Sequence, residues 1–243
     1  WLCNGMFPGP RIHAKVDRPV MVRFCCNLPS LADHRGYGRP TPTTHLHNGH
    51  TESESDGNPM DMIEDSGGGT TPLGGYWKDH FYLNKRAGFT DPKFGPLGDV
   101  RETMSTLWYH DHCLDFTAQN VYRGNMGLYY MFNEFDTGDE NDTSPTAWKL
   151  PSGNFDVPLV FHDRVFDPAG KGYFDLFNLD GGFSPLANSG SENTGHRAAV
   201  LFAPIQCFVL FQSTLADLQQ ESLDEHFRND SATTKTHCAF KHY

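Results

Sequence analysis

Histidine is the residue type whose number and spacing could do chemistry in this sequence. The chain holds 13 histidines in 243 residues, and four of them form two H-x-H triplets, His45-Leu46-His47 and His110-Asp111-His112. Residues i and i+2 of a β-strand point to the same face, so each triplet could direct two imidazoles at one metal ion. Imidazole suits copper, zinc, iron and nickel. On spacing alone, ordinary surface or core histidines explain the triplets equally well, because about 0.7 such triplets are expected by chance.

Short strands between turns are the elements that must position these residues. Glycine and proline are abundant, at 24 and 16 residues, and all but two of each lie in residues 1–183. This density is typical of a loop-rich β protein. Residues 48–76 predict a long loop and residues 137–154 a linker. Period-two alternation, aromatic-rich runs or short apolar runs predict strands at 12–16, 20–24, 107–109, 128–132 and 157–161.

Composition excludes several classes of protein. Hydrophobic residues make up 37% of the chain, which is enough for a packed core and excludes wholesale disorder. The net charge of −11 gives no electrostatic case for binding nucleic acid or an anionic membrane surface. No apolar run approaches the length of a membrane span. The six cysteines show no paired metal-site spacing.

The two ends of the chain differ from its middle. The sequence begins Trp1-Leu2-Cys3 without an initiator methionine, so we expect the true N-terminus to lie upstream, and the cellular location stays open. Residues 184–243 are poor in glycine and proline and predict one helix at 214–227, with Thr214 and Asp217 in capping-box positions.

The flanks of the two triplets narrow the choice of chemistry. The runs 43–50 and 105–112, with 120–127 after the second, resemble the two copper-binding segments of the first cupredoxin domain of multicopper oxidases. This family includes laccases, bilirubin oxidases, spore-coat oxidases and phenoxazinone synthases. Residues 1–29 resemble the opening strands of that domain, and residues 155–181 resemble the entry to the second.

The resemblance implies a fold and a domain division. We expect an all-β, cupredoxin-like Greek-key β-sandwich over residues 1–153, which carries half of the ligands of the trinuclear copper centre. Residues 154–183 would start a second cupredoxin-like domain. Residues 184–243 depart from the family and form an atypical tail, which we interpret as truncated or frameshifted sequence; the alternative is a genuine variant C-terminus.

The resemblance also assigns residue roles. His45 matches the type 2 copper ligand, and His47, His110 and His112 match ligands of the type 3 copper pair. Asp56 matches an acidic residue that assists proton supply during oxygen reduction; its alternative role is that of a turn aspartate before Gly57.

Neighbouring residues are expected to be structural or without a role. Asp111 must point away from the ligand face, and Cys113 is expected to be a small buried residue. Packing is the expected role of Trp108 and Tyr109. Surface or core placement is expected of His50, His80 and His162.

The sequence contains no recognisable motif for the family's type 1 copper site. The run His237-Cys238-Ala239-Phe240-Lys241-His242 has alanine after the cysteine and a histidine one place early, so an accidental His-Cys pair is the expected interpretation. The trinuclear centre also needs four further histidines, which would have to come from an absent C-terminal domain or from another chain.

The implied function is that of a copper-dependent oxidase. It would couple oxidation of an unknown phenol-like reducing substrate to reduction of O₂ to water, with this chain as an N-terminal fragment. The alternative is a non-catalytic copper-binding or structural remnant. A zinc hydrolase built on His110 and His112 is disfavoured, because no H-E-x-x-H motif occurs.

Overall fold

The structure, a computed structural model, describes residues 1–63, 69–70, 72, 74–102, 106–166, 172–174, 206–209 and 234–241. They fall into two compact units, one from residues 1–158 with 212–243 and the other from residues 159–211. In the second unit, β9 (Phe161–Phe166) pairs antiparallel with β10 (Gly172–Tyr173) and β11 (Gln206–Val209). Nothing in this pairing tests the predicted domain boundaries, which stay predictions.

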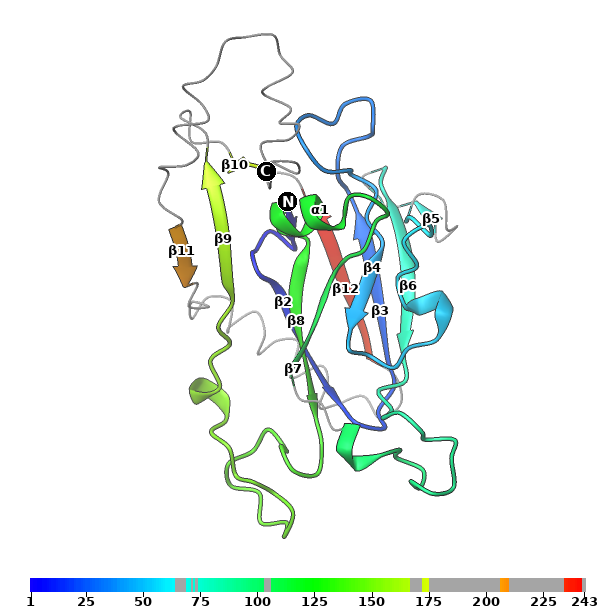
Figure 1. The fold of residues 1–243 in the computed structure, drawn as a ribbon, viewed down its shortest axis with the longest axis vertical. Helices are drawn as coiled ribbons and strands as arrows, with labels where there is room; N and C mark the ends of the chain where they lie inside the picture. Colours follow the sequence, from blue (N-terminus) through cyan, green and yellow to red (C-terminus); the bar gives the residue numbers. More distant parts are fainter. Residues whose placement is uncertain are drawn as a thin grey trace, which may run out of the picture. The chain divides into compact units, whose positions relative to one another are not determined.

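The first unit contains two sheets (Figure 1). One has the order β2 (Gly9–Lys15), β8 (Met126–Phe132), β7 (Thr106–Asp111) and β4 (Thr44–His47). The other has the order β1 (Leu2–Cys3), β12 (Thr234–Lys241), β3 (Val20–Cys26), β6 (Tyr76–Tyr82) and β5 (Gly69–Thr70). The pairs β2–β8 and β12–β3 are parallel, and the other neighbours are antiparallel.

Both sheets contribute to one hydrophobic core, which makes this unit a β-sandwich. In β3, alternate residues are buried, as a strand with one core-facing side requires. The core contains Val22 and Phe24 from one sheet and Ile12, Leu46 and Tyr129 from the other. The predicted all-β class is therefore confirmed.

Most of the predicted strands are confirmed, with longer bounds. The segments predicted at 12–16, 20–24, 107–109 and 128–132 correspond to β2, β3, β7 and β8. The prediction at 157–161 is wrong, because the strand begins only at Phe161. Pro158, inside the predicted run, has no N–H to give to a ladder.

Several of the described elements were not predicted from the sequence. Strand β6 begins at Tyr76, where the predicted loop 48–76 ends, and a 3-10 turn at Ser53–Ser55 lies within that loop. Helix α1 (Thr117–Arg123) ends at Gly124, whose φ of 116° is left-handed. The helix predicted at 214–227 lies outside the described residues. In the described part of the chain, no helix is long and apolar enough to cross a membrane.

Glycine is required where β8 passes the ring of Tyr109. The Tyr109 hydroxyl donates a 2.8 Å hydrogen bond to the carbonyl of Pro10, and its ring lies over the Cα of Gly127. A Cβ at Gly127 would overlap the phenol ring. The close approach of β7 to β8 therefore depends on the missing side chain.

We expect Gly127→Ala to lower the free energy of unfolding by about 2–3 kcal/mol, because the added methyl overpacks the core. Urea unfolding of the full chain measures the effect. Adding Tyr109→Leu removes the ring atoms that the methyl would overlap, so the double variant should lose less than the sum of the single variants. Additive losses would contradict the overlap.

His80 of β6 is a core residue rather than a surface one. Its side chain is 1% exposed, packs edge-on against Phe24 and has Nδ1 2.9 Å from the carbonyl oxygen of Ser55. Burial lowers the pKa of His80 to about 4, although the Ser55 carbonyl opposes the shift. The imidazole is therefore neutral in the folded protein at neutral pH.

This buried imidazole predicts a loss of stability in mild acid. Between pH 6.5 and about 4 the unfolded chain binds a proton at His80 that the folded chain does not, so stability falls as pH falls through that window. The contribution is about 3 kcal/mol. The free energy of unfolding of His80→Gln should depend less steeply on pH across this range. Burial also lowers the pKa of His13 to about 4, so the part of the pH dependence that comes from His13 should remain in the variant. Equal slopes in both proteins would contradict the prediction.

Candidate metal centre

The pairing of β4 with β7 brings the two H-x-H triplets together. The strands are antiparallel, with His45 opposite His110 and His47 opposite Trp108. Leu46, between the two histidines of β4, is 1% exposed in the core. The alternation of the strands therefore turns the imidazoles to the face that lies away from the core. His112 follows β7 by one residue.

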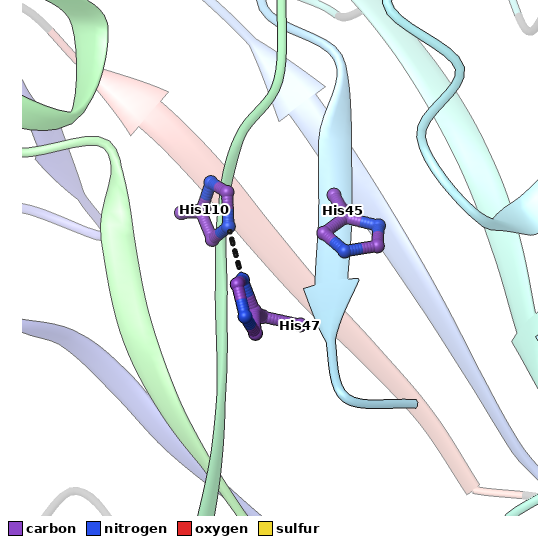
Figure 2. Close-up of side chains that lie close together, drawn as sticks. All are labelled: His45, His47 and His110. Atoms are coloured by element: carbon purple, nitrogen blue, oxygen red, sulfur yellow. Dashed lines mark hydrogen bonds between the residues drawn. The ribbon is translucent and has the colours of Figure 1, made fainter. Parts of the chain in front are cut away.

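Four imidazoles converge on this face. The ligand nitrogens of His45, His47 and His110 lie within 4.8 Å of one another. Figure 2 shows these three side chains close together. The ring of His112 lies 5.2 Å from that of His45 and 5.9 Å from that of His110, between centroids. The structure thus brings all four predicted ligands into one cluster.

Two nitrogens of the cluster are close enough to share one ion. Nδ1 of His47 lies 3.1 Å from Nε2 of His110 (Figure 2). Imidazole nitrogens bind zinc at about 2.0–2.1 Å, so two of them on one ion of similar size lie about 3 Å apart. The spacing fits a metal-binding pair.

Backbone carbonyls orient two of the rings. Nδ1 of His45 lies 2.5 Å from the carbonyl oxygen of Asp56, and Nδ1 of His110 lies 2.7 Å from that of Asp111. A carbonyl only accepts hydrogen bonds, so in each neutral ring Nδ1 carries the proton and the lone pair lies on Nε2. Metal-bound histidines are usually held in this way by their second nitrogen.

The environment of the cluster favours the binding of a cation. His110 is 5% exposed, and burial lowers its pKa to about 4, so it is in the neutral form that binds metals. Nδ1 of His112 is buried and has no hydrogen-bond partner among the described residues. A metal ion or a water molecule would supply the bonding partner of that nitrogen. The donor set of four imidazoles fits copper or zinc.

Asp56 lies beside the cluster and also occupies a turn. Its Oδ1 is 3.4 Å from Nδ1 of His45 and accepts a 2.7 Å hydrogen bond from the hydroxyl of Thr51. Its side chain is 48% exposed. Gly57 follows with a φ of 79°, and a Cβ there would overlap the backbone of Thr44 and His45. The two roles considered for Asp56 are therefore compatible.

Asp111 points away from the imidazoles, as expected from its place between them. Its carboxylate is 1% exposed and accepts hydrogen bonds from the backbone N–H of Thr43 and Cys113 and from the side-chain amide of Asn120. Burial raises the pKa of Asp111 to about 7, and the three donors oppose the shift. The carboxylate thus joins the residue before β4, the end of β7 and helix α1.

Asn120 is a positioning residue that sequence reasoning missed. Its side-chain amide also donates to the carbonyl of Arg39, and its oxygen accepts from the Arg39 backbone N–H. Its only signal in the sequence was its place in the run 120–127. Helix α1, which carries it, was not predicted.

The remaining residues singled out from the sequence lie apart from the cluster or beside it. Trp108 stacks on two of the imidazoles. Cys113 is fully buried, as expected, and His50 is exposed. His162 belongs to β9 in the second unit. The side chains of 237–242 are outside the described part of the chain, so the predicted absence of a type 1 site stays a prediction.

We expect Asp111→Asn to lower the free energy of unfolding by about 1.5–3 kcal/mol, because one carboxylate oxygen becomes an N–H₂ group facing an N–H donor. Urea unfolding measures the loss. Asp115→Asn is the matched control, since Asp115 is exposed and its φ of 62° suits asparagine. Equal stabilities of the two variants would show that the buried carboxylate does not hold the strands.

Known proteins with similar sequences are copper oxidases. The laccase of Bacillus subtilis (strain 168) is 32% identical over 188 residues, which cover 72% of this chain and 31% of the laccase. The bilirubin oxidase of Albifimbria verrucaria is 28% identical over 170 residues, which cover 69% of this chain and 22% of that enzyme.

Solved structures include similar proteins too. The McoA multicopper oxidase of Aquifex aeolicus aligns with a TM-score of 0.43 and 21% identity, over 69% of this chain and 28% of that one. No protein-family model matches the chain. The chain spans less than a third of the length of the two curated relatives. Their sequence similarity, over part of the relatives' length, supports a multicopper oxidase family for this chain.

Proposed function

We propose that this chain supplies half of the ligands of an oxygen-reducing copper centre in a copper-dependent oxidase. The observation that carries the proposal is the convergence of four imidazoles from two paired strands. His45 would hold the type 2 copper, and His47, His110 and His112 would hold the type 3 pair. Copper, when bound, would supply the one-electron redox chemistry that moves electrons from a reducing substrate to O₂.

The chain's own residues bind, orient and supply protons. The carbonyls of Asp56 and Asp111 bind Nδ1 of His45 and His110, and this leaves Nε2 of each ring as the nitrogen for a ligand bond. Reduction of one O₂ to two waters consumes four electrons and four protons. Asp56, half-exposed and beside His45, can pass protons from solvent toward the centre, and Thr51 holds its carboxylate in place.

The proposed centre needs ligands beyond this chain's cluster. Four imidazoles are half of the family's trinuclear set, and the type 1 cysteine segment is not recognisable in the sequence. The remaining ligands would come from a C-terminal domain or from another chain. The reducing substrate would bind near the type 1 copper, so its identity is not part of the proposal.

A second candidate is a non-catalytic copper-binding or structural remnant. The observation that favours it is the donor set of the described cluster, whose four imidazoles are half of the family's trinuclear set. An isolated half-set could bind copper without turning over oxygen.

Copper titration of the full chain tests the site. We expect His47→Ala and His45→Ala to weaken copper(II) binding at least about tenfold, measured by competition with a chelator. Both side chains lie at least partly exposed, so their truncation leaves the core intact. His50→Ala, at an exposed histidine outside the cluster, should bind copper like the wild type. Equal binding by all four proteins would overturn the proposed site.

Oxygen uptake separates the two candidates. Uptake with a phenolic donor, together with three or more coppers per assembled protein, would support the oxidase. At most one copper per protein, without oxygen uptake, would support the non-catalytic remnant instead.

A further inference from the structure

Trp108 makes planar contacts with two of the proposed copper ligands. Its indole ring lies 4.0 Å from the ring of His110, centroid to centroid, with 29° between the planes. It lies 5.2 Å from the ring of His47, with 27° between the planes. These two imidazoles are the pair whose nitrogens lie 3.1 Å apart. The indole is therefore packed against the part of the cluster best arranged to hold one ion.

The strand register imposes this arrangement. Trp108 and His110 are residues i and i+2 of β7, and His47 is the cross-strand partner of Trp108 in β4. All three side chains thus lie on one face, while Leu107 and Tyr109 face the core. Directly opposed residues of an antiparallel pair are within side-chain reach, so an aromatic ring here contacts both imidazoles.

The imidazoles of His47 and His110 differ in the number of other contacts that fix their orientation. The His110 ring is 5% exposed and bonded through Nδ1 to the carbonyl of Asp111. The His47 ring is exposed, and among the described residues its polar contact is with His110 itself. Rotation of histidine about χ2 is broad, so an exposed ring needs a neighbour to set its plane. The indole face provides that neighbour for His47.

We propose that Trp108 is a positioning residue that sets the ring planes of His47 and His110 before copper binds. The inference rests on the copper-binding role proposed above. Trp108 does not touch the metal in this scheme. It limits the orientations that the two imidazoles sample, so that less ordering is needed when the ion arrives.

The test uses the full chain with copper(II) alone as the probe. Trp108→Leu removes the planar face, and Trp108→Phe keeps a smaller one. Residues that support metal ligands change affinity by about 10–100-fold when they are replaced. We expect copper binding to weaken about tenfold in Trp108→Leu and to recover to within about threefold of wild type in Trp108→Phe.

Trp77→Leu is the matched control. Trp77 is a half-buried tryptophan of β6, in the other sheet, and packs against the guanidinium of Arg23 rather than against a histidine. We expect its copper affinity to equal that of the wild type. Urea unfolding of each variant establishes that it is folded before its affinity is compared.

Two spectroscopic measurements report on ring geometry rather than on stability. In the metal-free chain, stacking under an indole should shift the imidazole proton signals of His47 and His110 upfield, and Trp108→Leu should remove that shift. In the copper-loaded chain, paramagnetic resonance of Trp108→Leu should show a mixture of copper environments where the wild type shows fewer.

The outcomes distinguish this inference from the function on which it rests. If His47→Ala weakens copper binding while a folded Trp108→Leu keeps the wild-type affinity and spectra, positioning by Trp108 is overturned and the copper site stands. If His47→Ala leaves copper binding unchanged, the copper site itself is overturned. In that case the loss of upfield shifts in Trp108→Leu would show only that the rings stack.

Discussion

The antiparallel register between β4 and β7 is the constraint on which the rest of the centre depends. It sets His45 opposite His110 and His47 opposite Trp108, and it sends Leu46 and Tyr109 into the core. A slip by one residue would turn imidazoles into the core and apolar side chains to the cluster face, because side chains alternate with a period of two. Core burial therefore fixes which residues meet at the cluster, even though the cluster lies outside the core.

A buried carboxylate closes the end of this strand pair. Asp111 accepts three N–H donors, from Thr43, Cys113 and Asn120, and so joins both strands to helix α1. Burial of an ionisable group lowers the stability of the fold unless the group is hydrogen-bonded. The backbone carbonyl of Asp111 accepts from Nδ1 of His110. One residue thus anchors the backbone with its side chain and orients a proposed ligand with its carbonyl.

The proposed copper centre would be one side of a larger site. His110 is buried, His47 is exposed, and Nδ1 of His112 has no partner among the described residues. Ligand nitrogens that are oriented but incompletely bonded are suited to sharing ions with a second set of donors. The chain also spans less than a third of its curated relatives in the multicopper oxidase family.

The sequence by itself determined the local features of this protein. Alternation predicted β2 and β3, aromatic runs predicted β7 and β8, and the H-x-H spacing predicted that each triplet presents two imidazoles on one side. These features are local because they depend on the geometry of one strand. Only the tertiary structure decided that the two triplets meet, that Asn120 holds Asp111 and that Trp108 stacks on His47. The meeting of the triplets and the Trp108–His47 stack join residues that are far apart along the chain, and strand pairing sets their partners rather than any short pattern. Asn120 is near Asp111 in the sequence, but it reaches the carboxylate from helix α1, which no pattern predicted.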